Sequence, residues 1–276
     1  MNGSGADAFS GRTVWITGAS SGIGAALARE FSSRGANVAL SGRDEERLRK
    51  VTDQLQTQFL ILPFDVRDDG AMTDATDTAT GWLNGIDIFV ANAGVSQRSL
   101  AEDTGTDVYR EIIQIDLMAQ IAAVQAILPH MLRRGSGRLV FISSIAGKVG
   151  VPLRTAYCAA KHGLIGYADA LRAEVASHGV RVHVVCPGSV ATNVSRNALT
   201  ADGSKRGRSD RAIDNGIPPE EAAREIAEGI AAGQREIIVA RGAERALGEA
   251  RRTPDELFDR MAQMMADGYA DKMKDE

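Results

Sequence analysis

The sequence predicts an α/β fold, a doubly wound parallel sheet in a single domain that carries a C-terminal helical extension. Three observations indicate this fold: strand-like and helical segments alternate, a glycine-rich turn follows the first strand, and polar motifs follow the ends of later strands. The chain has 276 residues, of which 44% are hydrophobic, so it can bury one large core. We expect residues 1–240 to form the domain and residues 241–276 to form the helical tail.

Several apolar segments have the length and composition of strands. They lie near residues 13–17, 36–41, 58–64, 86–91, 138–143, 180–186 and 235–239. Stretches with helical spacing separate them, and the two longest predicted helices lie near 107–134 and 155–178. Because strands that alternate with helices form βαβ units, we expect a parallel sheet with its ligand site beyond the carboxyl ends of the strands.

A glycine-rich segment, Thr17–Gly24, joins the first predicted strand to a helix expected over residues 22–34. Gly18, Gly22 and Gly24 let the backbone turn tightly and approach a pyrophosphate. The free amides and the positive dipole end of the helix would then face the phosphates. An ordinary strand-to-helix turn is the alternative interpretation, but the strand and helix context fits a dinucleotide site on both sides.

Tyr157 and Lys161 are four residues apart on a predicted helix and therefore share one face. Ser144 lies thirteen residues before Tyr157. A tyrosine has a pKa near ~10, and a nearby ammonium stabilises its phenolate, which favours an acid/base role closer to neutral pH. With the glycine-rich segment, these residues predict nicotinamide redox chemistry.

In this order and spacing, the motifs resemble those of the short-chain dehydrogenase/reductase family, over residues 11–239. Besides Thr17–Gly24 and the Tyr157/Lys161 pair, the motifs are Asp65 after the third strand, Asn92–Gly94 after the fourth, Ser144 after the fifth, and Pro187-Gly188 followed by Thr192. The resemblance implies a Rossmann fold and a bound nicotinamide cofactor. The cofactor contacts that it implies are Gly18, Ser20, Ser21, Gly22, Ile23, Gly24, Arg43, Asp65, Val66, Asn92, Ala93, Gly94, Tyr157, Lys161, Pro187, Gly188, Val190 and Thr192.

The resemblance also implies the catalytic roles. Ser144 would hydrogen-bond the substrate oxygen, and Lys161 would hold the nicotinamide ribose. Tyr157 would protonate the carbonyl oxygen as hydride arrives, or take the proton in the reverse reaction.

The end of the second predicted strand indicates the cofactor. NAD-binding enzymes usually place an acidic side chain here for the ribose 2′-hydroxyl, whereas a 2′-phosphate needs a cation and no acid. Gly42 stands at the position of the acid, and Arg43 follows it. A guanidinium can hold a phosphate through two hydrogen bonds, so we expect NADP. The alternative is a surface arginine paired with Asp44 or Glu45.

Asp116 departs from the family pattern, because many members carry asparagine there. In those relatives the asparagine holds a water beside the active-site lysine largely through its backbone carbonyl, which an aspartate retains. We expect Asp116 to belong to the catalytic group. Its carboxylate would offset part of the Lys161 charge and move the pH optimum upward. Ala91 also replaces a common asparagine, and we regard that change as neutral.

Residues 193–218 are expected to form a polar flap over the substrate. The flap contains Lys205, Arg206, Arg208 and Arg211, which could bind an anionic group on the substrate, and also Asp202, Asp210 and Asp214. The mixed charges favour a self-paired, solvated surface. Residues 195–204 are similar to a segment in reductases related to 11β-hydroxysteroid dehydrogenase and to acyl- or alkyl-dihydroxyacetone-phosphate reductase. That resemblance implies a lipophilic carbonyl substrate.

The tail is expected to carry an apolar helical stripe opposite Asp259 and Arg260. The stripe consists of Leu257, Phe258, Met261, Met264 and Met265. It would cover the substrate cleft, a subunit neighbour or its own domain, and packing on its own domain is favoured. A membrane surface is less favoured because the polar face is not basic.

Composition and charge limit the kinds of binding partner and the cellular compartment that we expect. A formal net charge of −4 without a concentrated basic stripe predicts no nucleic-acid partner. Residues 1–10 do not resemble an export signal, and no uninterrupted apolar run approaches the length of a membrane span, so we expect a cytoplasmic protein. Cys158 and Cys186 fit a reducing compartment, and the four histidines lack ligand spacing, so no metal is predicted.

Three functions remain open at this stage. The leading one is an NADP-dependent carbonyl reductase, which by resemblance would be a homodimer or homotetramer assembled through the two long helices. The second is an alcohol dehydrogenase that works oxidatively in the cell. The third is a catalytically silent NADP-binding sensor or scaffold, for which Asp116 is the only indication. Intact Ser144, Tyr157 and Lys161 favour an enzyme.

Overall fold

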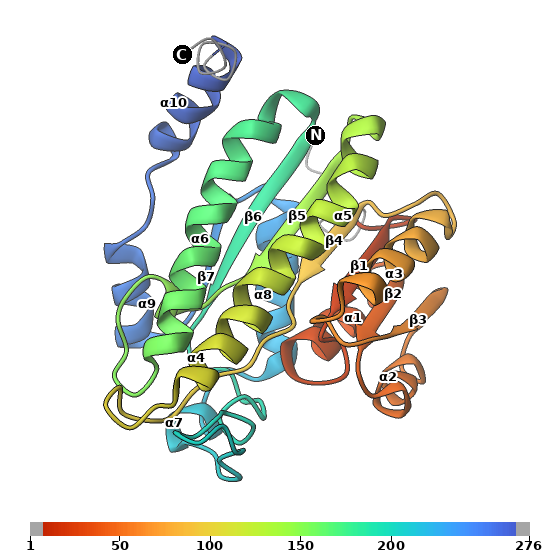
Figure 1. Cartoon of the computed structure of the whole chain (residues 1–276). Helices are drawn as coiled ribbons and strands as arrows, with labels where there is room; N and C mark the ends of the chain where they lie inside the picture. Colours follow the sequence, from red (N-terminus) through yellow and green to blue (C-terminus); the bar gives the residue numbers. More distant parts are fainter. Residues whose placement is uncertain (1–7, 269–276) are drawn as a thin grey trace.

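The computed structural model describes residues 8–268. One parallel sheet has the strand order β3-β2-β1-β4-β5-β6-β7, as Figure 1 shows. The strands are β1 (Thr13–Thr17), β2 (Asn37–Gly42), β3 (Phe59–Pro63), β4 (Ile88–Ala91), β5 (Gly137–Ile142), β6 (Val180–Pro187) and β7 (Glu236–Val239). The order reverses between β1 and β4, so the sheet is doubly wound and the predicted fold class is confirmed.

Helices cover both faces of this sheet (Figure 1). One face carries α1 (Gly22–Ser33), α2 (Glu45–Thr52) and α8 (Pro219–Ala231). The other face carries α3 (Asp69–Gly81), α5 (Ala119–Arg134) and α6 (Thr155–Val175), with α4 (Thr106–Ile113) leading towards α5. The short α7 (Arg211–Asp214) precedes α8, and α9 (Gly242–Ala250) and α10 (Asp255–Ala266) follow the last strand.

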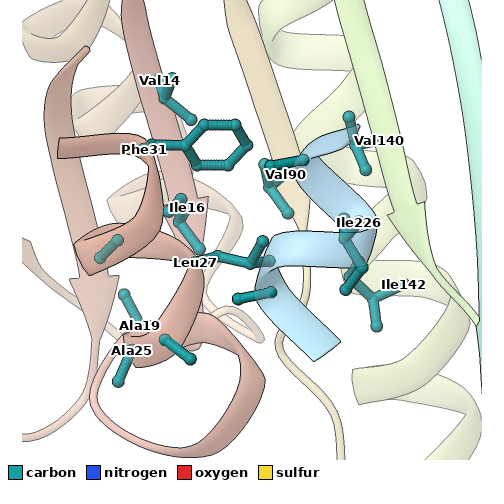
Figure 2. Close-up of a cluster of buried hydrophobic side chains, with 14 of the residues drawn as sticks. Val14, Ile16, Ala19, Ala25, Leu27, Phe31, Val90, Val140, Ile142 and Ile226 are labelled. Atoms are coloured by element: carbon teal, nitrogen blue, oxygen red, sulfur yellow. The ribbon is translucent and has the colours of Figure 1, made fainter. Parts of the chain in front are cut away.

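The core beneath α1 and α8 explains why the first βαβ unit holds its turn in place. Figure 2 shows Leu27 and Phe31 of α1 and Ile226 of α8 packed towards the apolar side chains of the central strands. All three are fully buried. Burying such a side chain contributes about 1.5–3 kcal/mol, so α1 is fixed on the sheet and its first turn is fixed beside the end of β1.

The single helix predicted near 107–134 is wrong in one respect. The helical run is continuous, but a π-helical turn, Gln114–Met118, separates α4 from α5. A π turn inserts one extra residue into an α-helix and is frequent at functional sites. Here it contains Asp116, the residue at which the sequence departs from the family pattern.

The same run is long and rich in apolar residues. By length and composition Thr106–Arg134 could cross a membrane. In this fold Val124, Ile127 and Met131 are fully buried in the core that α5 forms with the sheet. Packing therefore accounts for part of the apolar composition, since 39% of the most apolar stretch of this run is buried.

The tail packs on its own domain as far as the structure describes it. Phe258 of α10 lies between two guanidinium groups, with its ring centre 4.1 Å from Arg172 and 5.7 Å from Arg235. Helix α10 contacts α6 and the turn after it, at the end of the sheet opposite α7 (Figure 1). The predicted apolar stripe is only partly used, because Leu257 and Met264 remain exposed.

Candidate active site

The glycine-rich segment forms a tight turn that only glycine fits. Gly18 and Gly22 have φ values of +64° and +55°, a region that L-residues with a side chain seldom adopt. A Cβ on Gly18 would lie 2.8 Å from the Cα of Ala93, and one on Gly24 would lie 2.4 Å from the carbonyl oxygen of Gly18. Any side chain at Gly18 or Gly24 would therefore collide with the backbone around the turn.

Hydrogen bonds tie this turn to the end of β4. Asn92 Nδ2 donates to the carbonyl oxygens of Thr17 and Gly18, at 2.9 and 3.2 Å. In return, Thr17 Oγ1 accepts from the backbone amides of Asn92 and Ala93. Asn92 thus holds the loop by its side chain, and Thr17 is its partner, a role that the sequence did not reveal.

The first turn of α1 fits a pyrophosphate. Ser21 is the N-cap residue, but its side chain makes no capping hydrogen bond. The first amides of a helix have no partner within the helix, and an anion satisfies them well. An uncapped helix start beside an open glycine turn is therefore suited to a dinucleotide cofactor.

Three of the predicted catalytic residues come together at the carboxyl ends of β5 and β6. Ser144 follows β5, and its Oγ donates to the carbonyl oxygen of Pro187 at 3.3 Å. Lys161 is almost fully buried, and its Nζ donates to the carbonyl oxygen of Ile142 at 3.0 Å. This ammonium lies 5.6 Å from the ring centre of Tyr157. Contacts between α6 and the ends of β5 and β6 thus bring Ser144, Tyr157 and Lys161 to one place.

Asp116 joins this group as a fully buried carboxylate. Its Oδ1 accepts from the backbone amide of Val95 at 2.7 Å, and its Oδ2 lies 3.4 Å from Lys161 Nζ. Burial raises the pKa of Asp116, and the Lys161 charge opposes that shift. The side chain thus holds the loop after β4 and faces the Lys161 ammonium at the same time.

Asp116 and Lys161 act in opposite directions on Tyr157. Burial raises the pKa of Tyr157, Lys161 lowers it, and Asp116 raises it further. The carboxylate therefore offsets part of the stabilisation that the ammonium gives to the phenolate.

Comparisons with known proteins agree with this geometry. The family model described as short chain dehydrogenase matches residues 12–203. Dehydrogenase/reductase SDR family member 7B of Danio rerio is 39% identical over 238 residues, which cover 83% of this chain and 77% of the relative. The chain belongs to the short-chain dehydrogenase/reductase family.

Solved structures of family members have the same fold. A metagenomic short-chain oxidoreductase in complex with NADP has a TM-score of 0.70 and 29% identity, over 84% of this chain and 98% of that one. A short-chain dehydrogenase/reductase of Burkholderia phymatum in complex with NAD has a TM-score of 0.76 and 23% identity, over 83% of this chain and 89% of that one. This short-chain dehydrogenase/reductase thus shares the Rossmann fold of the family.

Asp116→Asn in this family member is expected to move the pH–rate profile to lower pH by about one unit. Removing the carboxylate leaves the Lys161 charge unopposed, so the pKa of Tyr157 falls. With Tyr157 as the expected acid/base, alcohol oxidation requires its deprotonated form, and the rising limb would therefore appear at lower pH. In reduction Tyr157 must be protonated, and the falling limb would move in the same direction. A profile of Asp116→Asn that superimposes on that of the parent would show that the carboxylate does not affect Tyr157.

Gly42, which has no side chain, and the cationic Arg43 stand at the end of β2 beside the glycine-rich turn. A Cβ on Gly42 would lie 3.4 Å from Ser20 Oγ, so β2 and the turn meet here. Arg43 is largely exposed, and its guanidinium lies 3.8 Å from Asp65. Within the described residues Arg43 pairs with neither Asp44 nor Glu45, which instead pair with Arg47 and Arg49. The alternative pairing considered for Arg43 is therefore wrong.

Other predicted cofactor residues differ in what their side chains do. Asp65 accepts two hydrogen bonds from the Arg67 guanidinium, at 3.0 and 2.6 Å, which hold the pKa of Asp65 below its usual range. Thr192 lies against Gly22, where a Cβ would be 3.1 Å from Thr192 Cγ2. The side chains of three further predicted residues pack on the core: Ile23, Val66 and Val190.

Glu244 in the tail supports the loop after β6, a role that no sequence pattern indicated. Its carboxylate accepts from the amide and the hydroxyl of Ser189, both at 2.7 Å. A Cβ on Gly188 would lie 2.3 Å from Glu244 Oε2, so the helix and the loop are in close contact. Helix α9 also presses Gly248 against Ile145, directly after Ser144. The tail thus positions two loops of the site.

The segment expected to form the flap is held to the loop after β4 by backbone hydrogen bonds. The amide of Leu199 donates to the carbonyl of Ser96, and the amide of Arg98 donates to the carbonyl of Leu199, both at 2.8 Å. Leu199 packs in one apolar cluster with Val95 and Tyr157. Residues of this segment therefore lie beside the predicted catalytic tyrosine.

The expectation of a self-paired flap surface needs correction. Arg206 pairs with Asp210 at 2.5 Å. Asp202 instead accepts from Thr200 and Ser204, and these hydrogen bonds lower its pKa to about 2. Within the described chain Lys205, Arg208 and Arg211 have no carboxylate within 4 Å. The reason is spatial: the sequence places acids and bases side by side, but the turns of the flap separate most of them.

Proposed function

We propose that the protein is an NADP(H)-dependent oxidoreductase that transfers hydride between the nicotinamide and a ketone or secondary alcohol. The observation that carries the proposal is the convergence of Ser144, Tyr157 and Lys161 beside an uncapped glycine-rich turn. An active enzyme is favoured over a silent sensor because the Lys161 ammonium lies within reach of the Tyr157 ring and is held by Ile142.

The nicotinamide, when bound, supplies or accepts the hydride. Ser144, held at the end of β5, would orient the substrate oxygen through its hydroxyl. Tyr157 would deliver its phenolic proton to that oxygen in reduction, or accept the proton in oxidation. Lys161 lowers the pKa of Tyr157 and so stabilises the phenolate that remains. The same residues serve both directions of the reaction.

The NADP preference is supported by the end of β2. Gly42 has no side chain that could accept from a ribose 2′-hydroxyl, and Arg43 is exposed with only a 3.8 Å contact to Asp65. The hydroxyl of Ser20 lies next to Gly42 and adds a donor. A guanidinium and a hydroxyl together suit a 2′-phosphate. The 29% identical oxidoreductase in complex with NADP is consistent with this choice.

Arg43→Ala is expected to weaken NADPH binding by about 10- to 100-fold, because a charge-assisted hydrogen bond contributes about 1.5–3 kcal/mol. NADH binding should change little, since NADH has no 2′-phosphate. Isothermal titration of both cofactors on the parent and the variant measures this. Arg47→Ala serves as a matched control, because Arg47 is an equally exposed arginine on α2 that pairs with Asp44. Equal affinity of the parent for NADPH and NADH would refute the role of Arg43.

We also propose a homodimer or homotetramer assembled through α5 and α6. Met118, at the end of the π turn that leads into α5, is 47% exposed, and Ile121 of α5 is half-buried, so apolar surface remains at the start of α5. Light scattering during size-exclusion chromatography should give a dimer or tetramer for the parent and a smaller assembly for Met118→Lys, because a lysine in an apolar interface must lose its hydration. A parent that elutes as a monomer would contradict the proposal.

A further inference from the structure

Three guanidinium groups surround one carboxylate beside the proposed catalytic residues. Asp210 accepts from Arg98 Nε at 2.8 Å and from Arg206 Nη1 at 2.5 Å, and Arg154 Nη2 lies 3.8 Å away. Among residues 8–268 no other carboxylate lies within 4 Å of these three guanidinium groups. Two of the three positive charges therefore remain unbalanced.

Arg154 is the guanidinium whose donors are least used. Asp210 already binds Arg98 and Arg206, and it also accepts from Ser195 Oγ at 2.8 Å. Although burial opposes the shift, these hydrogen bonds hold the pKa of Asp210 well below its usual range, so it stays ionised. Arg154 comes no closer than an ion-pair distance and makes no hydrogen bond within the described chain through its side chain.

The position of Arg154 connects this cluster to Tyr157. Arg154 is the N-cap residue of α6, and Tyr157 lies three residues further along the helix, one turn away. Leu153, which precedes it, has a φ of +65°, a strained conformation for a residue with a bulky side chain. The amide of Ser99 donates to the carbonyl of Leu153 and helps to hold it. Such strain is common where a loop must present a functional residue.

The surroundings combine apolar and cationic surface. Val95 and Leu199 pack in the apolar cluster that contains Tyr157. Arg98 follows Val95 closely in the same loop, and Arg206 and Asp210 belong to the segment that carries Leu199. The apolar wall and the unbalanced charge thus lie on the same segments around the proposed catalytic tyrosine.

We propose that the substrate of this site carries an anionic group, a carboxylate or a phosphate, which Arg154 binds with support from Arg98 and Arg206. The apolar part of the substrate would lie against Val95 and Leu199 while its carbonyl meets Tyr157. This inference rests on the proposed oxidoreductase function and narrows it to amphipathic anionic ketones. Arg154 suits the task because a planar guanidinium binds carboxylate and phosphate through two parallel hydrogen bonds.

The test compares medium-chain oxo acids with their methyl esters, which keep the carbonyl and the chain but lack the charge. NADPH-dependent kcat/KM is expected to favour the acids at least tenfold in the parent, which corresponds to about 1.4 kcal/mol. The acid-to-ester ratio should fall towards one in Arg154→Gln and be partly retained in Arg154→Lys. The loss should appear mainly in KM, since the charge is bound equally in the ground state and the transition state.

Arg208→Gln is the matched control, because Arg208 is an exposed arginine of the flap without a carboxylate partner in the described chain. It should keep the acid-to-ester ratio of the parent. At saturating NADPH, rising ionic strength should lower kcat/KM for the acids and leave that for the esters unaffected. Oxoalkyl phosphates of the same chain lengths show whether the site prefers a phosphate or a carboxylate. The preferred anion should give the higher kcat/KM in the parent, and that advantage should disappear in Arg154→Gln.

Two results would overturn the inference: equal kcat/KM for acids and esters in the parent, or an acid preference that survives Arg154→Gln. Either result would leave the proposed function in place, because reduction would still be observed. If the parent reduced no acid, ester, phosphate or other ketone although it bound NADPH, the proposed function itself would fail, and the inference with it.

Discussion

Tyr157→Phe is expected to lower kcat for carbonyl reduction by about 10²- to 10⁴-fold, the usual contribution of a positioned general acid. The variant loses only the hydroxyl. Its ring can still pack in the apolar cluster with Val95 and Leu199, so the fold and the crevice should be preserved. Because the proton is needed only as the reaction proceeds, kcat and kcat/KM should fall together while KM stays similar.

Stopped-flow or steady-state NADPH oxidation measures this loss, and NADPH binding by Tyr157→Phe serves as the check that the site is intact. Tyr109→Phe is a matched control, because it also removes a tyrosine hydroxyl. The Tyr109 hydroxyl on α4 hydrogen-bonds Thr155 on α6 at 2.8 Å. It should keep activity within a few-fold of the parent. If Tyr157→Phe retained activity within tenfold of the parent, another group would have to supply the proton.

Glu236→Gln is expected to lower the free energy of unfolding by about 3–5 kcal/mol, because it removes one partner of a buried ion pair. Lys148 and Glu236 have side chains only 4% and 3% exposed, and the Lys148 ammonium donates to Glu236 Oε1. Glu236 Oε2 also accepts from the amide of Thr253 at 2.9 Å. The pair thus joins the loop after Ser144, the edge strand β7 and the connection between α9 and α10. Without the carboxylate charge, the buried ammonium is left without compensation.

The midpoint of urea denaturation, with an unchanged m-value, measures the loss. The double variant Lys148→Met/Glu236→Leu should recover most of the stability, since apolar residues of similar volume often replace a buried ion pair without cost. Glu249→Gln is the surface control, because its pair with Arg245 is 49% exposed on both sides, and it should cost less than about 0.5 kcal/mol. A loss below 1 kcal/mol in Glu236→Gln would show that water reaches the pair.

Local patterns were sufficient for the fold class and for the identity of the main motifs. The apolar segments placed the strands within one or two residues, as with β1 at Thr13–Thr17 and β6 at Val180–Pro187. The long helix was predicted as one unit, and only the structure shows the π turn at Gln114–Met118. One extra residue in a helical turn hardly changes the spacing of apolar residues, so the sequence carries no signal for it.

The contacts of charged groups could not be predicted in the same way. The sequence offered Asp44 and Glu45 as alternative partners for Arg43, whereas the structure places it 3.8 Å from Asp65. The sequence did not reveal that Glu244 binds Ser189. Nor did it reveal that Arg98 pairs with Asp210, which is more than one hundred residues away in the chain. A long charged side chain can reach several oppositely charged groups. Which of them it pairs with depends on which remote segments of the chain pack beside it.

By itself the sequence determined the doubly wound sheet, the glycine-rich turn, and the presence of serine, tyrosine and lysine at family spacing, because strand and helix periodicity and tight turns depend on neighbouring residues. Only the tertiary structure decided that Asp116 also binds the amide of Val95, that the tail supports the loops of the site, and that three arginines share one carboxylate beside Tyr157. Those features depend on burial and on distances between remote segments, and both are set when the helices pack on the sheet.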